Sequence, residues 1–178
     1  MGQWLLLLTG APMRVVGQES KECPLVSRDG LLLKVELRSN PETLCIVRNA
    51  LGQLAQTLGF SEPECRSVVL AVDEALTNII RHAYQGKPEQ PIELYCRRIQ
   101  AALGGALKPA LEIVVEDRGA AVDAKKLCGR ALDDVRSGGL GLHFMRESMD
   151  AVEFRRRWHR NQLRMVKLMH GAEPPEGS

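Results

Sequence analysis

The chain has 178 residues, of which 44% are hydrophobic and 26% charged, and 24 Lys and Arg residues against 22 Asp and Glu residues give it a net charge of +2. This length suits one domain whose hydrophobic core needs no disulfide or metal to be stable. The near-neutral charge excludes a strongly basic nucleic-acid-binding surface, and an aromatic content of 4% argues against a surface that stacks nucleobases. We therefore expect no direct nucleic-acid partner.

The sequence predicts neither a membrane anchor nor a metal framework. No apolar run reaches about 18 residues, the length of a membrane-spanning helix. The apolar run Trp4–Leu8 lacks the positive charge that precedes the core of a secretory signal, so we expect residues 1–28 to be a loosely ordered extension; a signal peptide is the alternative. The five cysteines are widely spaced, without a Cys-x-x-Cys pair, which favours reduced, buried thiols in a cytoplasmic protein over zinc ligands.

The first half of the predicted domain is a strand followed by two helices. Residues 31–38 end in alternation, with Leu33, Val35 and Leu37 on one face, which predicts a strand. A first helix follows, with Asn40 as its expected cap, and its apolar residues recur every three or four positions. Ser61 and Glu64 form a capping box, which predicts a second helix from there to about Tyr84.

Strands dominate the second half. We expect strands over 91–100 and 110–116 joined by a turn at 103–109, an irregular segment at 118–138, a third helix over 140–149, and a hairpin of strands 152–159 and 163–169 that turns at 160–162. Because strands outnumber crossover helices, the expected fold is an α/β two-layer sandwich, with a mixed, mostly antiparallel sheet and about three helices on one face. The domain would span residues 29–171, before a disordered tail at 172–178.

The first candidate site is a polar stripe in the second predicted helix. Glu74, Asn78 and His82 are spaced four residues apart, so they share one helix face. A carboxylate can accept the proton of a hydroxyl group, and an amide oxygen is a suitable ligand for Mg²⁺. The pattern favours a general base beside a magnesium site; a solvated polar face is the alternative.

Two further candidate sites follow along the chain. Asp117 and Gly119 end an apolar strand, where a carboxylate can accept a hydrogen bond from an amine and a glycine admits a flat ring; an ordinary turn is the alternative. The glycine-rich run from Ser137 to Leu142 leads into the third helix, whose first N–H groups suit a phosphate. A flexible hinge is the alternative for this run.

In this order and at these separations, the three sites resemble the motifs of the GHKL ATPase superfamily, and most of all those of the bacterial anti-sigma-factor serine/threonine kinases. Asp73–Asn78 resembles that family's N box, Asp117–Gly119 its adenine-binding box, and Gly139–Leu142 its phosphate-binding glycine box. The resemblance covers about residues 31–170 and implies the Bergerat ATP-binding fold.

The resemblance also implies a role for each site residue. Glu74 would activate the attacking hydroxyl, and Asn78 would bind Mg²⁺. Asp117 would bind the adenine amine, with Gly119 beside the ring. Gly139 and Gly141 would lie against the phosphates under a mobile lid formed by residues 120–138. The other residues that would contact ATP are His82, Arg136, Leu140 and Leu142.

Two residues depart from the family pattern. Ala121 stands where many members have Gly or Pro, which implies a stiffer hinge for the lid. Gln162 stands near a position where relatives often have a small hydroxyl residue close to the adenine, which puts a water-mediated contact with the base in doubt.

The implied function is that of an ATP-dependent serine/threonine protein kinase acting as an anti-sigma factor. It would phosphorylate a small antagonist protein, bind a sigma factor, and work as a cytoplasmic homodimer without a membrane partner. The alternative is a nucleotide-gated binding module of the same fold without kinase activity. The pair of Glu74 and Asn78 favours the kinase, because a pure binding module needs no general base.

Overall fold

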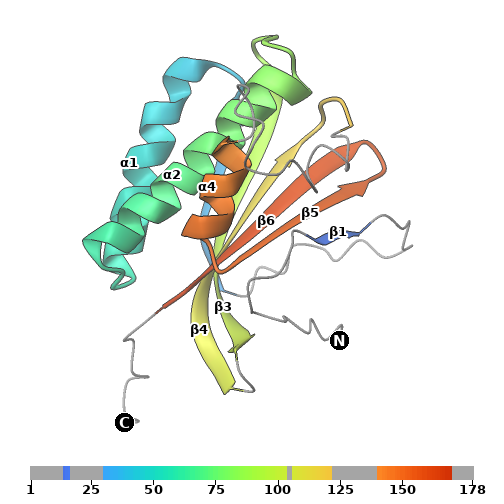
Figure 1. The fold of residues 1–178 in the computed structure, drawn as a ribbon. Helices are drawn as coiled ribbons and strands as arrows, with labels where there is room; N and C mark the ends of the chain where they lie inside the picture. The colour runs from blue at the N-terminus through green and yellow to red at the C-terminus, as the bar shows by residue number, and fades with distance from the viewer. Residues whose placement is uncertain (1–13, 17–29, 104–105, 122–139, 170–178) are drawn as a thin grey trace.

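The computed structural model describes residues 14–16, 30–103, 106–121 and 140–169, which form a sheet covered on one face by helices (Figure 1). A short 3₁₀ helix precedes the first α-helix, and a π-helical turn, η2, ends the second. The elements are the strands β1 Arg14–Val16, β2 Leu31–Arg38, β3 Pro91–Leu103, β4 Ala106–Asp117, β5 Ala151–Arg157 and β6 Arg160–Leu168, and the helices η1 Pro41–Thr43, α1 Leu44–Thr57, α2 Glu62–Asn78, η2 Ile79–Ala83 and α4 Leu140–Ser148.

The strands of the described residues lie in the order β1-β5-β6-β4-β3-β2, and every pair is antiparallel except β1 with β5. This confirms the expected mixed, mostly antiparallel sheet with helices on one face. Strand β1 comes from within the expected N-terminal extension and lies beside β5 (Figure 1). The rest of that extension, the lid segment from residue 122 to 138 and the tail at 172–178 lie outside the described residues. No described helix is long and apolar enough to cross a membrane.

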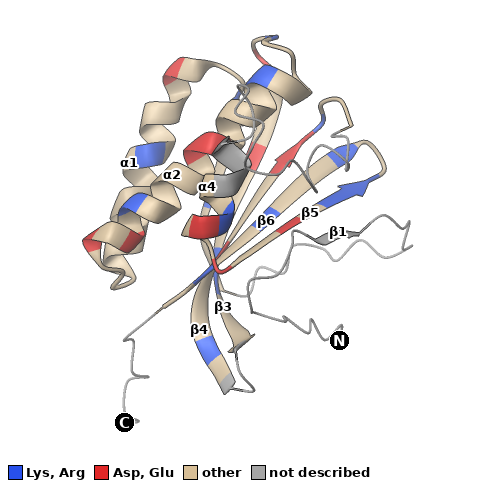
Figure 2. Ribbon diagram, viewed as in Figure 1, with Lys and Arg blue, Asp and Glu red and all other residues tan. Residues whose placement is uncertain are grey.

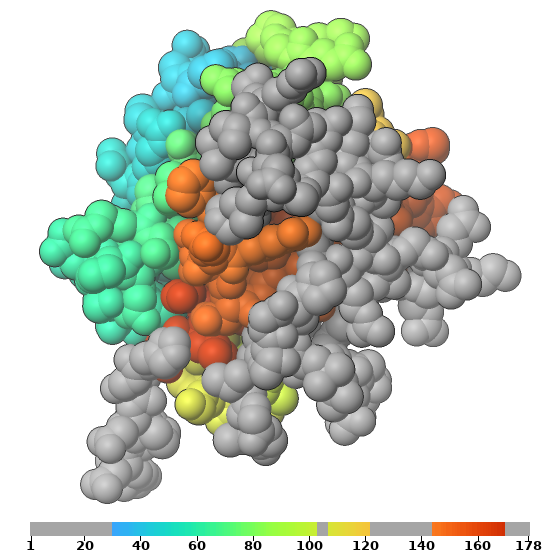
Figure 3. All heavy atoms as spheres, viewed as in Figure 1, coloured from blue at the N-terminus to red at the C-terminus, as the bar shows by residue number. Residues whose placement is uncertain are grey.

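The main core lies between the sheet and the helices. Leu51 of α1, Leu76 of α2 and Met145 of α4 are each 1% exposed, and they belong to one cluster with Leu94 of β3 and Ile113 of β4. The surfaces of the three helices adjoin one another in the space-filling view (Figure 3). Burial of one such side chain stabilises the fold by about 1.5–3 kcal/mol, so this layer holds α2 firmly on the sheet.

The opposite face of the sheet carries a network of charged side chains. Glu112 of β4 accepts hydrogen bonds from Arg97 Nη1 at 2.9 Å and from Arg164 Nε at 2.6 Å. Arg164 also lies 3.5 Å from Glu153 of β5. Basic residues are also concentrated where β5 and β6 meet their turn (Figure 2). Side chains alternate along a strand, so these charged residues lie on the face away from the main core. The same face also carries a smaller apolar cluster that includes Ala110 and Val166.

Three expectations about local structure were wrong. The Asn40 side chain does not cap a helix; instead it exchanges hydrogen bonds with Glu89. The residues expected to form a turn at 103–109 belong almost entirely to β3 and β4, which pair as far as Leu103 with Ala106. The last hairpin turns at Trp158 and His159 rather than at 160–162, and Trp158 takes a positive φ of 55°.

The described cysteines differ in exposure. Cys96 is buried, as expected, and Cys65 is half-buried, but Cys45 is exposed on α1. All three are free thiols. The expectation of buried thiols therefore holds only for some of them.

Candidate functional site

Helix α2 carries the first candidate residues, and its start is fixed locally. The Ser61 N–H and hydroxyl group both donate to the Glu64 carboxylate, at 2.8 and 2.6 Å, as the capping box predicts. The apolar stripe of the helix packs into the core, so the orientation of its polar stripe is set. Glu74 and Asn78 lie on that polar stripe, one turn apart and half-buried.

The α-helical spacing does not continue to His82. Residues Ile79–Ala83 form a π-helical turn, in which the Tyr84 N–H donates to the Ile79 carbonyl at 2.9 Å. This wider turn changes the direction in which later side chains leave the helix. His82 is exposed whereas Glu74 and Asn78 are half-buried, so the three residues do not form one continuous α-helical stripe.

The π-helical turn meets the end of β4. Three consecutive backbone N–H groups after β4 are hydrogen-bonded, two of them to the end of the helix and one within the loop. Arg118 N–H donates to the Tyr84 hydroxyl at 2.8 Å, Gly119 N–H to Asp117 Oδ1 at 2.7 Å, and Ala120 N–H to the Ala83 carbonyl at 2.9 Å. We call this contact between η2 and residues 117–120 the α2–β4 joint. It places Asp117 on the same packed unit as the helix that carries Glu74 and Asn78.

Gly119 is required at this joint because of its neighbour. A Cβ atom on Gly119 would lie 2.6 Å from Ala83 Cβ and 2.7 Å from the Ala83 carbonyl carbon and oxygen. Real Cβ atoms do not approach other atoms so closely, so any side chain here would push the joint apart. The close packing of η2 on this loop accounts for the glycine.

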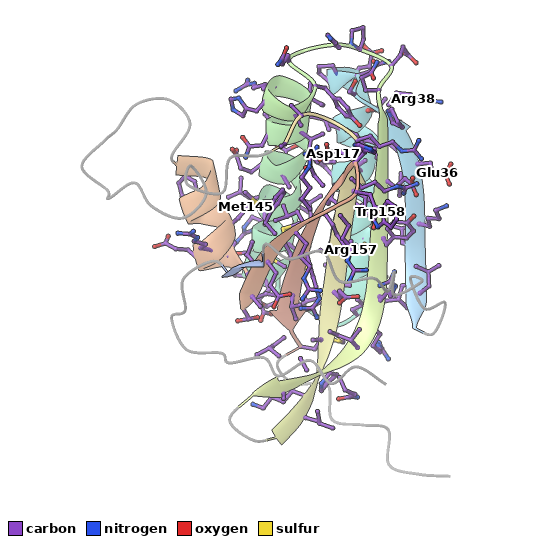
Figure 4. The ribbon with its side chains drawn as sticks, turned by 90° about the vertical axis from the view of Figure 1, so that its right-hand side faces the viewer. Glu36, Arg38, Asp117, Met145, Arg157 and Trp158 are labelled. Carbon is purple, nitrogen blue, oxygen red and sulfur yellow. The ribbon has the colours of Figure 1, made fainter. Side chains whose placement is uncertain are left out.

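Asp117 is a buried carboxylate held by neutral donors. It is 4% exposed, and its Oδ1 accepts hydrogen bonds from the Gly119 N–H and, at 2.8 Å, from Asn161 Nδ2. Burial raises the pKa of Asp117 above its usual value, and the two hydrogen bonds act in the opposite direction. Figure 4 shows Asp117 toward the same end of the sheet as Trp158, at the tip of the β5–β6 hairpin.

The structure adds one site residue that the sequence did not indicate. Asn161 lies in β6, directly opposite Asp117 of β4 on one side and Arg156 of β5 on the other. Gln162, the residue expected near this position, faces the other side of the sheet and donates to Glu116 at 2.8 Å. In the sequence, Asn161 comes two residues after the expected strand 152–159, and an asparagine in that position suggested a turn rather than a site residue.

The glycine-rich run is described only in part. Helix α4 begins at Leu140, so Gly141 and Leu142 belong to its first turn, where backbone N–H groups have no partner within the helix. The helix packs against α2 through core residues that include Met145. Gly139 and Arg136 lie outside the described residues.

Comparisons of the sequence with known proteins match it to an ATPase domain and to serine-protein kinases. A family model described as a histidine kinase-like ATPase domain matches residues 37–167. Serine-protein kinase RsbW from Bacillus pumilus is 32% identical over 130 residues, which cover 68% of this chain and 76% of the relative. Serine-protein kinase RsbW from Bacillus subtilis is 29% identical over 128 residues, which cover 67% and 75%.

A solved structure shares the fold. It is the crystal structure of the RsbU and RsbW domains of Rv1364c from Mycobacterium tuberculosis, with a TM-score of 0.52 and 14% identity. The match covers 80% of this chain and 34% of that longer one. The family model spans most of the chain, and the Bacillus relatives match it over two thirds of its length. The chain therefore belongs to the histidine kinase-like ATPase domain family and, within it, to the serine-protein kinases of the RsbW type.

Proposed function

We propose that this chain is an ATP-dependent serine/threonine protein kinase that acts as an anti-sigma factor. It transfers the γ-phosphoryl group of ATP to a small antagonist protein and, in its other state, binds a sigma factor, so that the two partners compete for it. The observation that carries the proposal is the α2–β4 joint, because it holds Glu74 and Asn78 on the same packed unit as Asp117.

Each residue of this unit has one task in the proposed transfer. Glu74 accepts the proton of the attacking serine or threonine hydroxyl group. The hydroxyl oxygen then bonds to the γ-phosphorus, and ADP leaves. Asp117 accepts a hydrogen bond from the 6-amino group of adenine. The phosphates contact His82, Arg136 and the run from Gly139 to Leu142.

The residues on α2 fit a magnesium ion. Mg²⁺ in nucleotide sites is bound by one or two protein oxygens together with the phosphates of the substrate. Asn78 supplies an amide oxygen at the last residue of α2, half-buried, one turn after the Glu74 carboxylate. When bound, Mg²⁺ neutralises the negative charge of the phosphates. Asn78 is therefore the proposed magnesium ligand.

Substitution of the proposed base tests the kinase. We expect Glu74→Gln to lower phosphoryl transfer to the antagonist protein by roughly 10²–10⁴-fold, because the amide cannot accept the proton. ATP should still bind, since the substitution keeps the size of the side chain. The assay is transfer from labelled Mg·ATP to the antagonist encoded beside the gene, with Glu62→Gln, an exposed glutamate in the first turn of the same helix, as the control.

Two outcomes would decide against this proposal. If Glu74→Gln transfers phosphate at the wild-type rate, Glu74 is only a surface residue. If wild-type protein binds ATP and the antagonist but transfers nothing, the chain is a nucleotide-gated binding module of the same fold.

We further propose that the protein works as a homodimer in the cytoplasm. Its net charge of +2 gives no large repulsion between two copies. Association should therefore depend little on salt. Sedimentation equilibrium at micromolar concentration and two ionic strengths is the test, and a monomer under both conditions would contradict the proposal.

A further inference from the structure

The side-chain amide of Asn161 has only one orientation. Its Nδ2 donates to Asp117 Oδ1 at 2.8 Å and to the Ala120 carbonyl at 3.0 Å, and its Oδ1 accepts from Arg156 Nη1 at 2.7 Å. A carboxylate and a carbonyl only accept hydrogen bonds, whereas a guanidinium only donates them. Rotation of the amide by 180° would place its oxygen against the two acceptors and its NH₂ group against the Arg156 guanidinium. Asn161 is also only 1% exposed, so no water can take over these contacts.

This fixed amide determines which oxygen of Asp117 is available. Oδ1 already accepts from the Asn161 amide and from the Gly119 N–H, at 2.8 and 2.7 Å. Among the described residues, no hydrogen bond ends on Oδ2 of this carboxylate. A ligand that reaches Asp117 therefore meets Oδ2, which can only accept a hydrogen bond while the group is ionised.

We propose that Asn161 is a positioning residue: it fixes which atom of residue 117 faces the nucleobase, and so makes the site select purines with an amino group at position 6. The inference rests on the proposed function, because it takes ATP as the ligand. The 6-amino group of adenine is a donor and matches Oδ2. The 6-oxo group of hypoxanthine or guanine is an acceptor and faces another acceptor, which a buried site rejects strongly.

The same geometry predicts the effect of an amide at position 117. In Asp117→Asn the two N–H donors still face the position of Oδ1, so the new amide places its oxygen there. Its NH₂ group then points to the base. The acceptor that matched adenine becomes a donor that matches a 6-oxo purine. The substitution should reverse the base preference rather than abolish nucleotide binding.

Calorimetry with Mg·ATP and Mg·ITP on the full chain measures this preference, since the two nucleotides differ only in the hydrogen-bonding edge of the base. We expect wild type to favour ATP at least about tenfold and Asp117→Asn to favour ITP, because one hydrogen bond to a charged group corresponds to about one to two decades in affinity. Adding Asn161→Asp to Asp117→Asn places an acceptor at position 161. The amide at 117 should then turn its NH₂ group inward, and the preference for ITP should fall.

A matched control and a second variant complete the test. Gln162→Ala, a neighbour of Asn161 on the opposite face of the sheet, should leave the ATP-to-ITP ratio unchanged. If the double variant melts below the assay temperature, Asn161→Ser is combined with Asp117→Asn in place of Asn161→Asp. The serine hydroxyl group can both donate and accept a hydrogen bond, so the preference of Asp117→Asn for ITP over ATP should become smaller.

The outcomes distinguish the proposed function from the role assigned to Asn161. If wild type binds no ATP, the proposed function fails, and this inference with it. If wild type prefers ATP but Asp117→Asn keeps that preference, only the assignment of Asn161 is overturned. The same holds if folded variants at position 161 leave the ratio unchanged.

Discussion

Gly119→Ala should destabilise the protein by an amount that follows from the α2–β4 joint. The added Cβ would lie 2.6 Å from Ala83 Cβ and 2.7 Å from the Ala83 carbonyl carbon and oxygen, none of which can rotate away. Overpacking of this kind costs about 1–3 kcal/mol. Separation of the joint also breaks the hydrogen bond from Ala120 N–H to the Ala83 carbonyl, which contributes about 0.5–1.5 kcal/mol. The expected loss in free energy of unfolding is therefore about 2–4 kcal/mol.

Thermal unfolding followed by circular dichroism measures this loss. For a chain of this size, 1 kcal/mol corresponds to about 2–4 °C in Tm, so Gly119→Ala should melt about 4–16 °C below wild type. Gly52→Ala is the control: Gly52 lies within α1, and its added Cβ would meet only Val69 Cγ2 at 3.8 Å, an ordinary contact. Because alanine favours a helix over glycine by about 0.5–1 kcal/mol, this variant should melt slightly above wild type. A Tm of Gly119→Ala within about 2 °C of wild type would refute the role given to the contact with Ala83.

Three more outcomes follow from burial and charge. Burial raises the pKa of Asp117, so the folded state binds the carboxyl proton more tightly than the unfolded state does. Wild type should therefore lose stability as the pH rises from about 4 to about 7. In urea unfolding, the stability of Asp117→Asn relative to wild type should increase over the same pH range. Burial also raises the pKa of the Cys96 thiol to about 12, so a maleimide at neutral pH should label the exposed Cys45 and leave Cys96 unlabelled until urea is added, as peptide mapping would show. Glu112→Gln should cost about 3 kcal/mol in urea unfolding, because it removes the carboxylate shared by the buried Arg97 and the partly buried Arg164, whereas Glu36→Gln, which removes an exposed ion pair, should change little.

Elements specified by local signals could be predicted from the sequence. The alternating segment at 31–38 is β2 with the expected bounds, and the capping box of Ser61 and Glu64 begins α2. Both depend on residues close together in the chain. Strands β3 and β4 extend beyond their expected ends. The run from residue 103 to 109, which contains two glycines and Pro109, had suggested a turn. In the structure Pro109 lies opposite Gln100 in the ladder, and its carbonyl accepts from the Met169 N–H, so pairing overrides its local preference.

The base-facing part of the site could not be predicted, because it depends on the register of the last hairpin. Trp158 is an unfavourable residue for the positive φ that it adopts, so the sequence favoured a turn at 160–162 instead. With the turn at Trp158 and His159, Asn161 lies in β6 opposite Asp117. Side chains alternate between faces, so the next residue, Gln162, points away from the site. A displacement of the turn by two residues thus determines which side chain contacts Asp117.

One backbone proton, the Ala120 N–H, can be used to measure how often the α2–β4 joint opens. The Ala120 N–H is bonded to the carbonyl of Ala83, so it can exchange with solvent deuterium only when the end of α2 and the end of β4 separate. The amide proton of Gly119, its neighbour in sequence, is bonded to the Asp117 side chain within the same loop and can exchange without separation of the helix from the strand. The exchange rate at Ala120 relative to Gly119 therefore reports how often the helix carrying Glu74 separates from the strand carrying Asp117.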